Sequence, residues 1–169
     1  MEKKTKSGLA KLKVWQLIVA LVVVVFGTTL FVGAVSGWFG ETKVSLDVEY
    51  YCGETCDGEY AELTSEEYEN MVKAEKSFIV FVDQGGCTTA DRMREYVVKY
   101  ALEKGIKVYR MMFSNMKETS LHTNVKYYPS VVVISKGRIM NWLKADSDDD
   151  AEKYNNYDSF KEWAEGIIK

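Results

Sequence analysis

One run of apolar residues in the middle of the chain ends just before a cysteine. The five residues from Phe78 to Val82 are β-branched or aromatic, and the run is too short for a helix, so it predicts a buried strand. Gly85 and Gly86 interrupt the pattern. Apolar residues then recur with helical spacing at Met93, Tyr96, Val97, Tyr100 and Ala101, and Gly105 supplies a stop. The pattern therefore places Cys87 where a buried strand turns into the N-terminus of an amphipathic helix.

This placement makes Cys87 a candidate nucleophile. The first turn of a helix has unpaired N–H groups and a partial positive charge, and both favour a thiolate over a thiol. The thiolate is the nucleophilic form of cysteine. The alternative interpretation is an inert, half-buried thiol or simply a small residue at a crowded turn.

The other apolar patterns predict strands and helices that alternate along the chain. Alternating or continuous apolar runs predict strands at 44–50, 60–63, 106–113, 130–135 and 138–143. The capping box Thr64 to Glu67 opens a helix through Lys73, and Asp158 or Ser159 is predicted to cap a final helix. Strands alternating with helices imply parallel pairing, while the closing hairpin adds an antiparallel edge. The expected fold is an α/β sandwich with a mixed central sheet.

The N-terminal segment has the pattern of a membrane anchor. Five lysines precede a stretch without charge from Val14 to Gly40, whose centre is long enough to span a bilayer as a helix. The lysine excess predicts a cytoplasmic N-terminus at 1–13, a transmembrane signal-anchor helix at 14–38 and an extracytoplasmic remainder. That remainder divides into a juxtamembrane segment at 39–58, with the extra strand and a cysteine turn, and a domain at 59–169. The alternative is a signal peptide cleaved near Ala34-Val35-Ser36.

The charge of the chain argues against nucleic acid as a partner. The chain has 22 basic and 25 acidic residues, and the first forty residues contain five lysines and one glutamate. The rest therefore has 17 basic and 24 acidic residues, a net charge of −7. The acidic stretch 144–156, which contains Asp146, Asp148, Asp149 and Asp150, is predicted to be a solvated loop.

The chain has an odd number of cysteines, so they cannot all pair with one another. The chain has three cysteines, so at least one is free or pairs with another molecule. Cys52 and Cys56 are predicted to form a local disulfide in an oxidising compartment. The alternative is that one of them resolves a mixed disulfide on Cys87. A zinc site lacks ligands at the usual spacings, the single His122 is predicted to lie on the surface, and no metal or cofactor is expected.

Two stretches resemble the thioredoxin superfamily over roughly Tyr60 to Lys169. One is the buried strand that leads into Cys87 at a helix start. The other, Val125-Lys-Tyr-Tyr-Pro129-Ser130 with the strand and Lys136-Gly137 turn that follow, is similar to the family's cis-proline segment. The resemblance implies a cis Tyr128–Pro129 bond lying against the Cys87 sulfur. It also implies that Gly86, Tyr128 and Pro129 bind an extended substrate peptide.

The sequence departs from the family at three positions. Thioredoxins carry Cys-x-x-Cys, but the fourth position here is Ala90, so no resolving thiol lies one helical turn away. Gly86 replaces the usual tryptophan, and Phe81 replaces the usual buried aspartate. These departures exclude a dithiol cycle within this motif.

Two functional hypotheses remain, and both place the domain outside the cytoplasm on a membrane anchor. In the first, Cys87 carries out thiol–disulfide exchange with secreted peptides or proteins that contain thiols or disulfides. In the second, the domain is a non-catalytic binding or accessory module of an envelope or secretion complex. Whether the protein is an enzyme therefore depends on the reactivity of Cys87.

Overall fold

The computed structural model describes residues 15–16, 18–19, 22–23, 43–58 and 60–169. The chain divides into two compact units, Met1–Glu41 and Thr42–Lys169. The described residues of the first unit are helical. Segment 1–13, most of the predicted anchor 14–38 and the candidate cleavage site lie outside the described residues. Among the residues that are described, no helix is long and apolar enough to cross a membrane.

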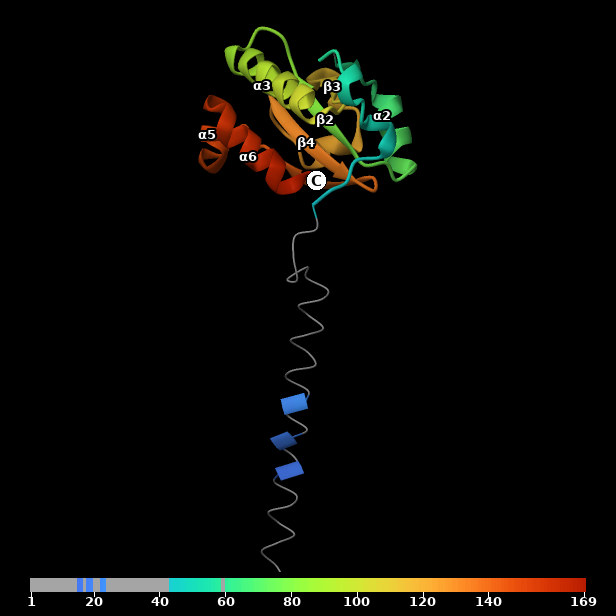
Figure 1. The fold of residues 1–169 in the computed structure, drawn as a ribbon, viewed down its shortest axis with the longest axis vertical. Helices are drawn as coiled ribbons and strands as arrows, with labels where there is room; N and C mark the ends of the chain where they lie inside the picture. The colour runs from blue at the N-terminus through green and yellow to red at the C-terminus, as the bar shows by residue number, and fades with distance from the viewer. Residues whose placement is uncertain (1–14, 17, 20–21, 24–42, 59) are drawn as a thin grey trace, which may run out of the picture. The chain divides into compact units, whose positions relative to one another are not determined.

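The second unit is built on a five-stranded mixed sheet with the order β1-β3-β2-β4-β5 (Figure 1). β1 pairs in parallel with β3 and β3 with β2, whereas β2 with β4 and β4 with β5 are antiparallel. The strands are β1 Ala61–Glu62, β2 Phe78–Asp83, β3 Tyr109–Met112, β4 Ser130–Ser135 and β5 Arg138–Trp142. The predicted α/β fold with a mixed sheet is confirmed. The apolar run that predicts the central strand becomes β2, every residue of which is buried.

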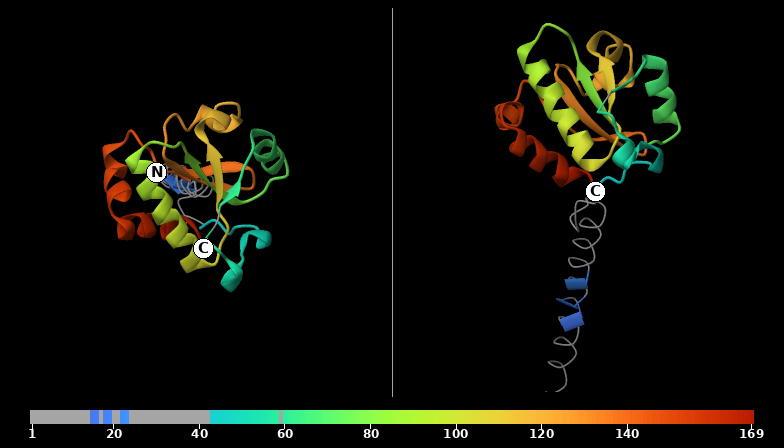
Figure 2. Two further views of the ribbon diagram at one scale, coloured as in Figure 1. Left: turned by 90° about the horizontal axis from the view of Figure 1, so that it is seen from above. Right: turned by 45° about the horizontal axis from the view of Figure 1, so that its top comes forward.

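Helices cover both faces of the sheet (Figures 1 and 2). α3 and α6 lie on one face, with α5 beside them, and α2 lies on the other. The described helices are α2 Ser65–Lys73, α3 Thr88–Lys104, α4 Phe113–Met116, α5 Ala151–Asn155 and α6 Tyr157–Ile167. Short 3-10 helices occur at Val48–Tyr50, Gly53–Thr55, Ser120–Thr123 and Asp148–Asp150.

Helix caps fix where the covering helices begin and end. The predicted capping box is present, since the hydroxyl of Thr64 accepts from the Glu67 amide and the Glu67 carboxylate accepts from the Thr64 amide. Gly105 ends α3 in the left-handed conformation, at a φ of 61°. The predicted cap of the last helix is wrong, because Asn156 caps α6 by accepting from the amides of Asp158 and Ser159.

The segment 43–58 is part of the domain and does not form the expected extra strand. Val44 makes an isolated parallel bridge to Ile168, and a 3-10 helix follows at Val48–Tyr50. The alternation fails at Val48, which is 86% exposed, whereas Leu46 and Tyr50 are buried in the core. The described part of this segment thus covers the core of the second unit as an irregular stretch.

The acidic stretch 144–156 also has more structure than a solvated loop. It contains the 3-10 helix Asp148–Asp150 and the helix α5. Tyr154, which lies in α5, is only 6% exposed. The stretch therefore packs onto the domain near the start of α3, with which α5 is in contact.

Candidate functional site

Cys87 is the N-cap residue of α3. Its carbonyl oxygen accepts a hydrogen bond from the Asp91 amide at 3.0 Å, and its side chain caps no helix amide. The side chain is half-buried and is the only free thiol in the described part of the chain. Gly86 precedes it with a φ of 84°, a conformation that favours glycine in the turn between β2 and α3. The thiol therefore sits at the electron-poor end of α3.

A surface groove of about 470 Å³ brings Cys87 together with the predicted proline segment. The peptide bond between Tyr128 and Pro129 is cis, and both residues line the groove with Cys87. Gly86 is exposed and does not line it, and a side chain there would meet no atom within 4 Å. Tyr128 and Pro129, two of the three residues assigned to substrate binding, thus line the groove with the thiol. The third, Gly86, precedes Cys87 in the chain but lies outside the groove lining.

The far wall of the groove comes from residues that the sequence analysis missed. Tyr154 in α5 lines the groove and donates a hydrogen bond from its hydroxyl to the Pro129 carbonyl at 2.9 Å. Burial raises the pKa of the Tyr154 hydroxyl above its ordinary value, and the neighbouring carboxylates of Asp150 and Asp146 raise it further. Arg92, in the first turns of α3, donates to the Tyr154 carbonyl at 3.4 Å and to the Asn155 side chain. These contacts hold α5 beside the thiol.

Two carboxylates give the groove a negative charge. Asp146 and Asp148 line it, and no lysine or arginine does. Within the described residues neither carboxylate forms a salt bridge, whereas the neighbouring Asp150 pairs with Lys153 at 2.7 Å. The acidic stretch of the sequence thus contributes directly to the surroundings of Cys87.

No second thiol lies near Cys87. Ala90, one helical turn further along, is fully buried. Cys52 and Cys56 form a disulfide, with Cα atoms 5.2 Å apart, at the opposite end of α3. The amides of Cys52 and Gly53 both donate to the carbonyl of Gly105, which ends that helix, at 2.8 and 3.0 Å.

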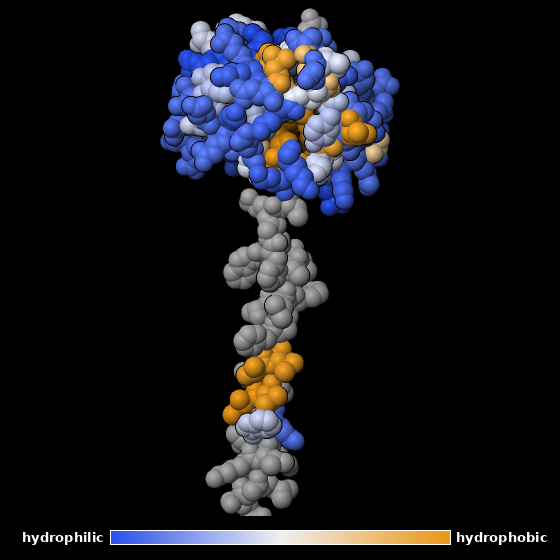
Figure 3. Space-filling model, in the orientation of Figure 1, coloured by the Kyte–Doolittle hydropathy of each residue, from blue (hydrophilic) through white to orange (hydrophobic). Residues whose placement is uncertain are grey.

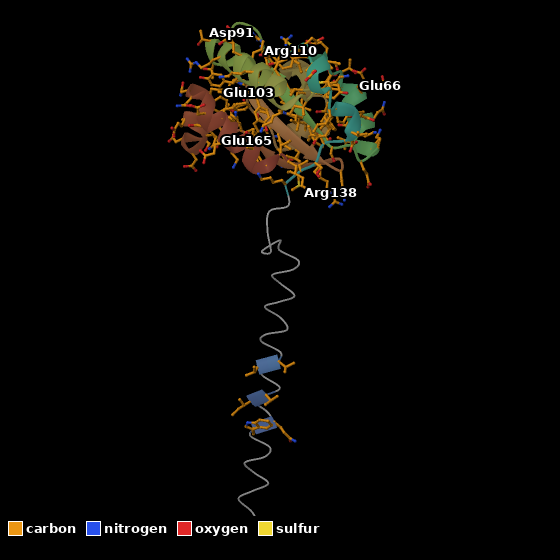
Figure 4. The ribbon with its side chains drawn as sticks, in the orientation of Figure 1. Glu66, Asp91, Glu103, Arg110, Arg138 and Glu165 are labelled. Carbon is orange, nitrogen blue, oxygen red and sulfur yellow. A yellow bond between two sulfur atoms is a disulfide. The ribbon has the colours of Figure 1, made fainter. Side chains whose placement is uncertain are left out.

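The length of α3 excludes one of the alternatives raised by the sequence. The helix has 17 residues. At 1.5 Å per residue, the helix separates the free thiol from the disulfide by about 25 Å. Figure 4 marks this separation with Asp91 near the start of α3 and Glu103 near its end. Cys52 or Cys56 therefore cannot resolve a mixed disulfide on Cys87 of the same folded molecule.

A buried carboxylate at the end of β2 is a second feature that the sequence analysis missed. Asp83 is fully buried, and its Oδ2 accepts from Arg94 Nη2 and from Arg110 Nε, both at 2.8 Å. Its Oδ1 is also buried and has no partner among the described residues. The hydrogen bonds to Asp83 and Asp91 raise the pKa of the Arg94 guanidinium. Asp83 thus ties α3 to the two central strands.

Phe81 occupies the place where the family's buried aspartate is expected. It is fully buried, and its ring stacks on that of Tyr60 with centroids 5.8 Å apart. The carboxylate nearest along the chain is Asp83, which follows two residues later on the same strand. A charged residue that ends an otherwise apolar strand, followed by an arginine two or three helical turns later, is the signal that could have indicated this ion pair.

The remaining sequence candidates do not join the groove. His122 is half-buried, does not line the groove, and its Nδ1 is buried without a hydrogen-bond partner in the described part of the chain. His122 therefore does not share the groove with Cys87. Among the described residues, no group of three His, Cys, Asp or Glu side chains is placed to hold a metal ion.

Comparison with solved structures identifies the fold. A mutant thioredoxin from Halobacterium salinarum NRC-1 superposes with a TM-score of 0.52 at 12% identity, covering 69% of this chain and 97% of that one. Mitochondrial thioredoxin 3 of Saccharomyces cerevisiae, at 12% identity, covers 63% of this chain and 93% of its own, with a TM-score of 0.48. Thioredoxin f from spinach chloroplast, at 15% identity, covers 65% and 94%, with a TM-score of 0.48.

These findings place the second unit among proteins with the thioredoxin fold. The superposition on the Halobacterium protein, together with the strand order and the cis-proline beside Cys87, supports that assignment. No protein-family model matches the sequence, and no curated protein matches it significantly.

Proposed function

We propose that this protein carries out thiol–disulfide exchange through a single nucleophilic cysteine, Cys87. The observation that supports this proposal is the groove that holds the half-buried thiol and the cis Tyr128–Pro129 segment together. The thiol lies at the N-terminus of α3, a helix of 17 residues, and is partly exposed. The groove is open to the surface, so an extended peptide can reach the sulfur.

The reaction that a single thiol supports is the formation of a mixed disulfide. The Cys87 thiolate attacks one sulfur of a substrate disulfide, a new S–S bond forms, and the other substrate sulfur leaves as a thiolate. Because Ala90 offers no second thiol, the mixed disulfide persists until a thiol from outside the groove attacks it. This chemistry fits reduction or isomerisation of secreted peptides and proteins.

The proposed setting is the outer side of a membrane. The lysines before the uncharged segment 14–40 support an anchor with a cytoplasmic N-terminus and an extracytoplasmic domain. A membrane-impermeant biotin reagent added to intact cells should label lysines beyond Glu41. If those lysines react only after the cells are lysed, the proposed topology is wrong.

A binding module is the second candidate function. The buried Ala90 at the position of the resolving cysteine favours it, because the groove could hold an extended peptide without exchange. The two functions differ in one measurable property, the reactivity of Cys87 toward disulfides.

The deciding experiment is adduct formation with a disulfide-containing peptide. The purified full-length protein, in detergent, is incubated at neutral pH with a peptide that carries an activated disulfide, and intact mass is followed with time. We expect one long-lived peptide adduct on Cys87, and alkylation of this thiol faster than that of a free model thiol. The Cys87→Ser variant, which keeps the size and polarity of the side chain, should form no adduct.

The opposite outcome selects the other function. If the parent protein forms no adduct, and Cys87 is alkylated no faster than the model thiol, thiol exchange is excluded. Retention of the same peptide by both the parent and Cys87→Ser proteins would then support the binding module.

A further inference from the structure

The disulfide between Cys52 and Cys56 lies in a second groove on the domain. This groove has a volume of about 490 Å³, and both cysteines line it. Its apolar wall comes from α3 and the segment that follows that helix, with Val98, Ala101, Ile106 and Val108. Both cysteines are half-buried, so the S–S bond is partly accessible from the surface. Accessible disulfides are more often labile or catalytic than buried ones.

Backbone contacts hold the cysteine loop in place without the disulfide. The hydrogen bonds from the amides of Cys52 and Gly53 to the Gly105 carbonyl hold the loop on the end of α3. The Thr55 hydroxyl also donates to the Cys52 carbonyl at 2.7 Å. The antiparallel bridge between Tyr51 and Ile106 holds the residue that precedes it. The loop can therefore keep its position when the two sulfurs are reduced, which a redox-active pair requires.

The free thiol and the disulfide lie at opposite ends of α3. Cys87 is the N-cap residue of the helix, and the amides of Cys52 and Gly53 donate to the carbonyl of Gly105 at its other end. One domain therefore presents two separate sulfur sites, each in its own groove.

We propose that the Cys52/Cys56 pair of one copy resolves the mixed disulfide held on Cys87 of a second copy. This inference rests on the proposed exchange function of Cys87. The chain contains three cysteines in all. It thus carries both an attacking thiol and a resolving pair, but the two are about 25 Å apart along α3 and cannot meet within one folded molecule. Two copies can bring them together.

The exchange balances once a soluble dithiol has reduced the Cys52–Cys56 pair. A thiolate of the reduced pair attacks the substrate sulfur of the mixed disulfide, and Cys87 leaves as a thiolate and takes a proton from water. The second thiol of the pair then attacks the first, so the Cys52–Cys56 bond forms and the substrate leaves as a thiol. The mixed disulfide gains two electrons, which its two sulfurs share, and the pair loses two. A soluble dithiol is the class of donor that would reduce the pair again.

Two complementary variants test the proposal in the full-length chain in detergent micelles. The Cys52→Ser/Cys56→Ser protein is loaded with a disulfide peptide on Cys87 and freed of excess peptide. The Cys87→Ser protein is reduced with dithiothreitol, desalted and added. We expect peptide release at least tenfold faster than with an equal concentration of a reduced synthetic peptide of residues 50–58. A Cys52–Cys56 disulfide should appear in the Cys87→Ser protein at the same rate.

The outcomes separate this inference from the function on which it rests. If no adduct forms on the double-serine protein although its melting curve shows a folded domain, exchange through Cys87 is wrong. If the adduct forms but the reduced Cys87→Ser protein releases it no faster than the synthetic peptide does, only resolution by a second copy is wrong. Oxidised Cys87→Ser protein serves as the control and should release nothing.

Discussion

The two ends of helix α3 differ in how firmly they are fixed and in what their sulfur atoms can do. At the start, Cys87 caps the helix only with its backbone, its thiol is free, and a groove opens beside it. At the end, Gly105 closes the helix and accepts two amide hydrogen bonds from a loop whose cysteines are already joined. The first end is therefore built for access, and the second is held by several backbone contacts.

Neighbouring elements reinforce this difference. Near the start of α3, Arg94 pairs with the buried carboxylate of Asp83, which also pairs with Arg110. The acidic stretch lines the groove beside this end of the helix. The last turn of α3 is tied to α6 by surface ion pairs, Lys104 with Glu165 and Lys161 with Glu103. In Figure 3 the visible face of the domain is mostly hydrophilic, with hydrophobic patches near its middle. Ion pairs thus help to hold α3 in place near both of its ends.

Among the proposed substitutions, removal of the buried Asp83 carboxylate near the start of α3 should lower the stability of the domain the most. In Asp83→Ala, the guanidinium groups of Arg94 and Arg110 lose their shared buried partner. We expect the free energy of unfolding to fall by about 3 kcal/mol, because the two guanidinium groups lose a buried partner and keep only exposed ones, Asp91 and Glu62. Urea unfolding of the full-length protein measures this change.

A matched variant isolates the effect of burial. Asp91→Ala removes the other carboxylate that binds Arg94, but this carboxylate is exposed, so the loss should stay below about 1 kcal/mol. Equal losses in the two variants would show that Asp83 does not hold α3 in the way proposed.

Substitution of the glycine that ends α3 should have the next largest effect. A Cβ atom at Gly105 would lie 2.8 Å from the Gly53 Cα atom, and the φ of 61° is unfavourable for alanine. We expect Gly105→Ala to lower the free energy of unfolding by about 2 kcal/mol. Reduction of the Cys52–Cys56 disulfide by dithiothreitol should also become faster, because the new methyl group displaces the cysteine loop from the Gly105 carbonyl.

Gly53 provides the control for this prediction. Its φ of 54° is similar, but a Cβ atom there would meet nothing within 4 Å. Gly53→Ala should therefore show only the conformational cost, about 1 kcal/mol, with little change in the reduction rate. Alkylation of Cys87 should be unchanged in both variants, because the thiol lies at the other end of the helix.

The first end of α3 could be predicted from the sequence because its signals are local. The apolar run, the two glycines and the helical spacing after Cys87 lie within about twenty-five residues of one another. The two ion pairs of Asp83 could not be predicted in this way, because the partners lie 11 and 27 positions further on. They meet Asp83 only through the packing of α3 on the sheet and the pairing of β2 with β3. The resemblance places the family's carboxylate at position 81, where this chain has Phe81, whereas the buried carboxylate of this chain lies two residues later.

The second end was predicted only in part because its patterns have two explanations. Alternation over Val44 to Tyr50 is typical of a half-buried strand, but an irregular segment can bury Val44, Leu46 and Tyr50 in the core while it leaves Val48 exposed. The disulfide followed from spacing and compartment, whereas its position on Gly105 depends on long-range packing. The acidic stretch was misjudged because charge dominates its composition, although Tyr154 supplies a buried anchor.

A thiol added at the first end should convert its single-cysteine chemistry into a cycle. Ala90→Cys places a sulfur one helical turn from Cys87, on the same helix. We expect disulfide reductase turnover, measured with excess dithiothreitol and a fluorescent disulfide substrate, to rise at least tenfold over the parent protein. The gain is limited because Phe81 supplies no carboxylate to deprotonate the new thiol.

Ala90→Ser is the matched control, since it adds a group of similar position without a thiol. Its turnover should not exceed that of the parent protein, and in the absence of dithiothreitol it should keep the long-lived adduct on Cys87. If Ala90→Cys forms adducts as persistent as those of Ala90→Ser, the added sulfur does not reach Cys87.

The smallest expected effect concerns the charge of the groove at the first end. Asp146 and Asp148 line it without a salt bridge in the described part of the chain, so they should favour cationic peptides. We expect adduct formation to be about three times faster with a peptide that has lysine beside its disulfide than with one that has glutamate, since exposed charges contribute less than about 1 kcal/mol. Asp146→Asn/Asp148→Asn should remove most of this preference, and added salt should weaken it in the parent protein.

Asp149→Asn changes the same stretch by one charge without touching the groove, so it should leave the preference nearly intact. If Asp149→Asn lowers the preference as much as the double variant does, the net charge of the domain sets the rate, and the groove residues have no special role.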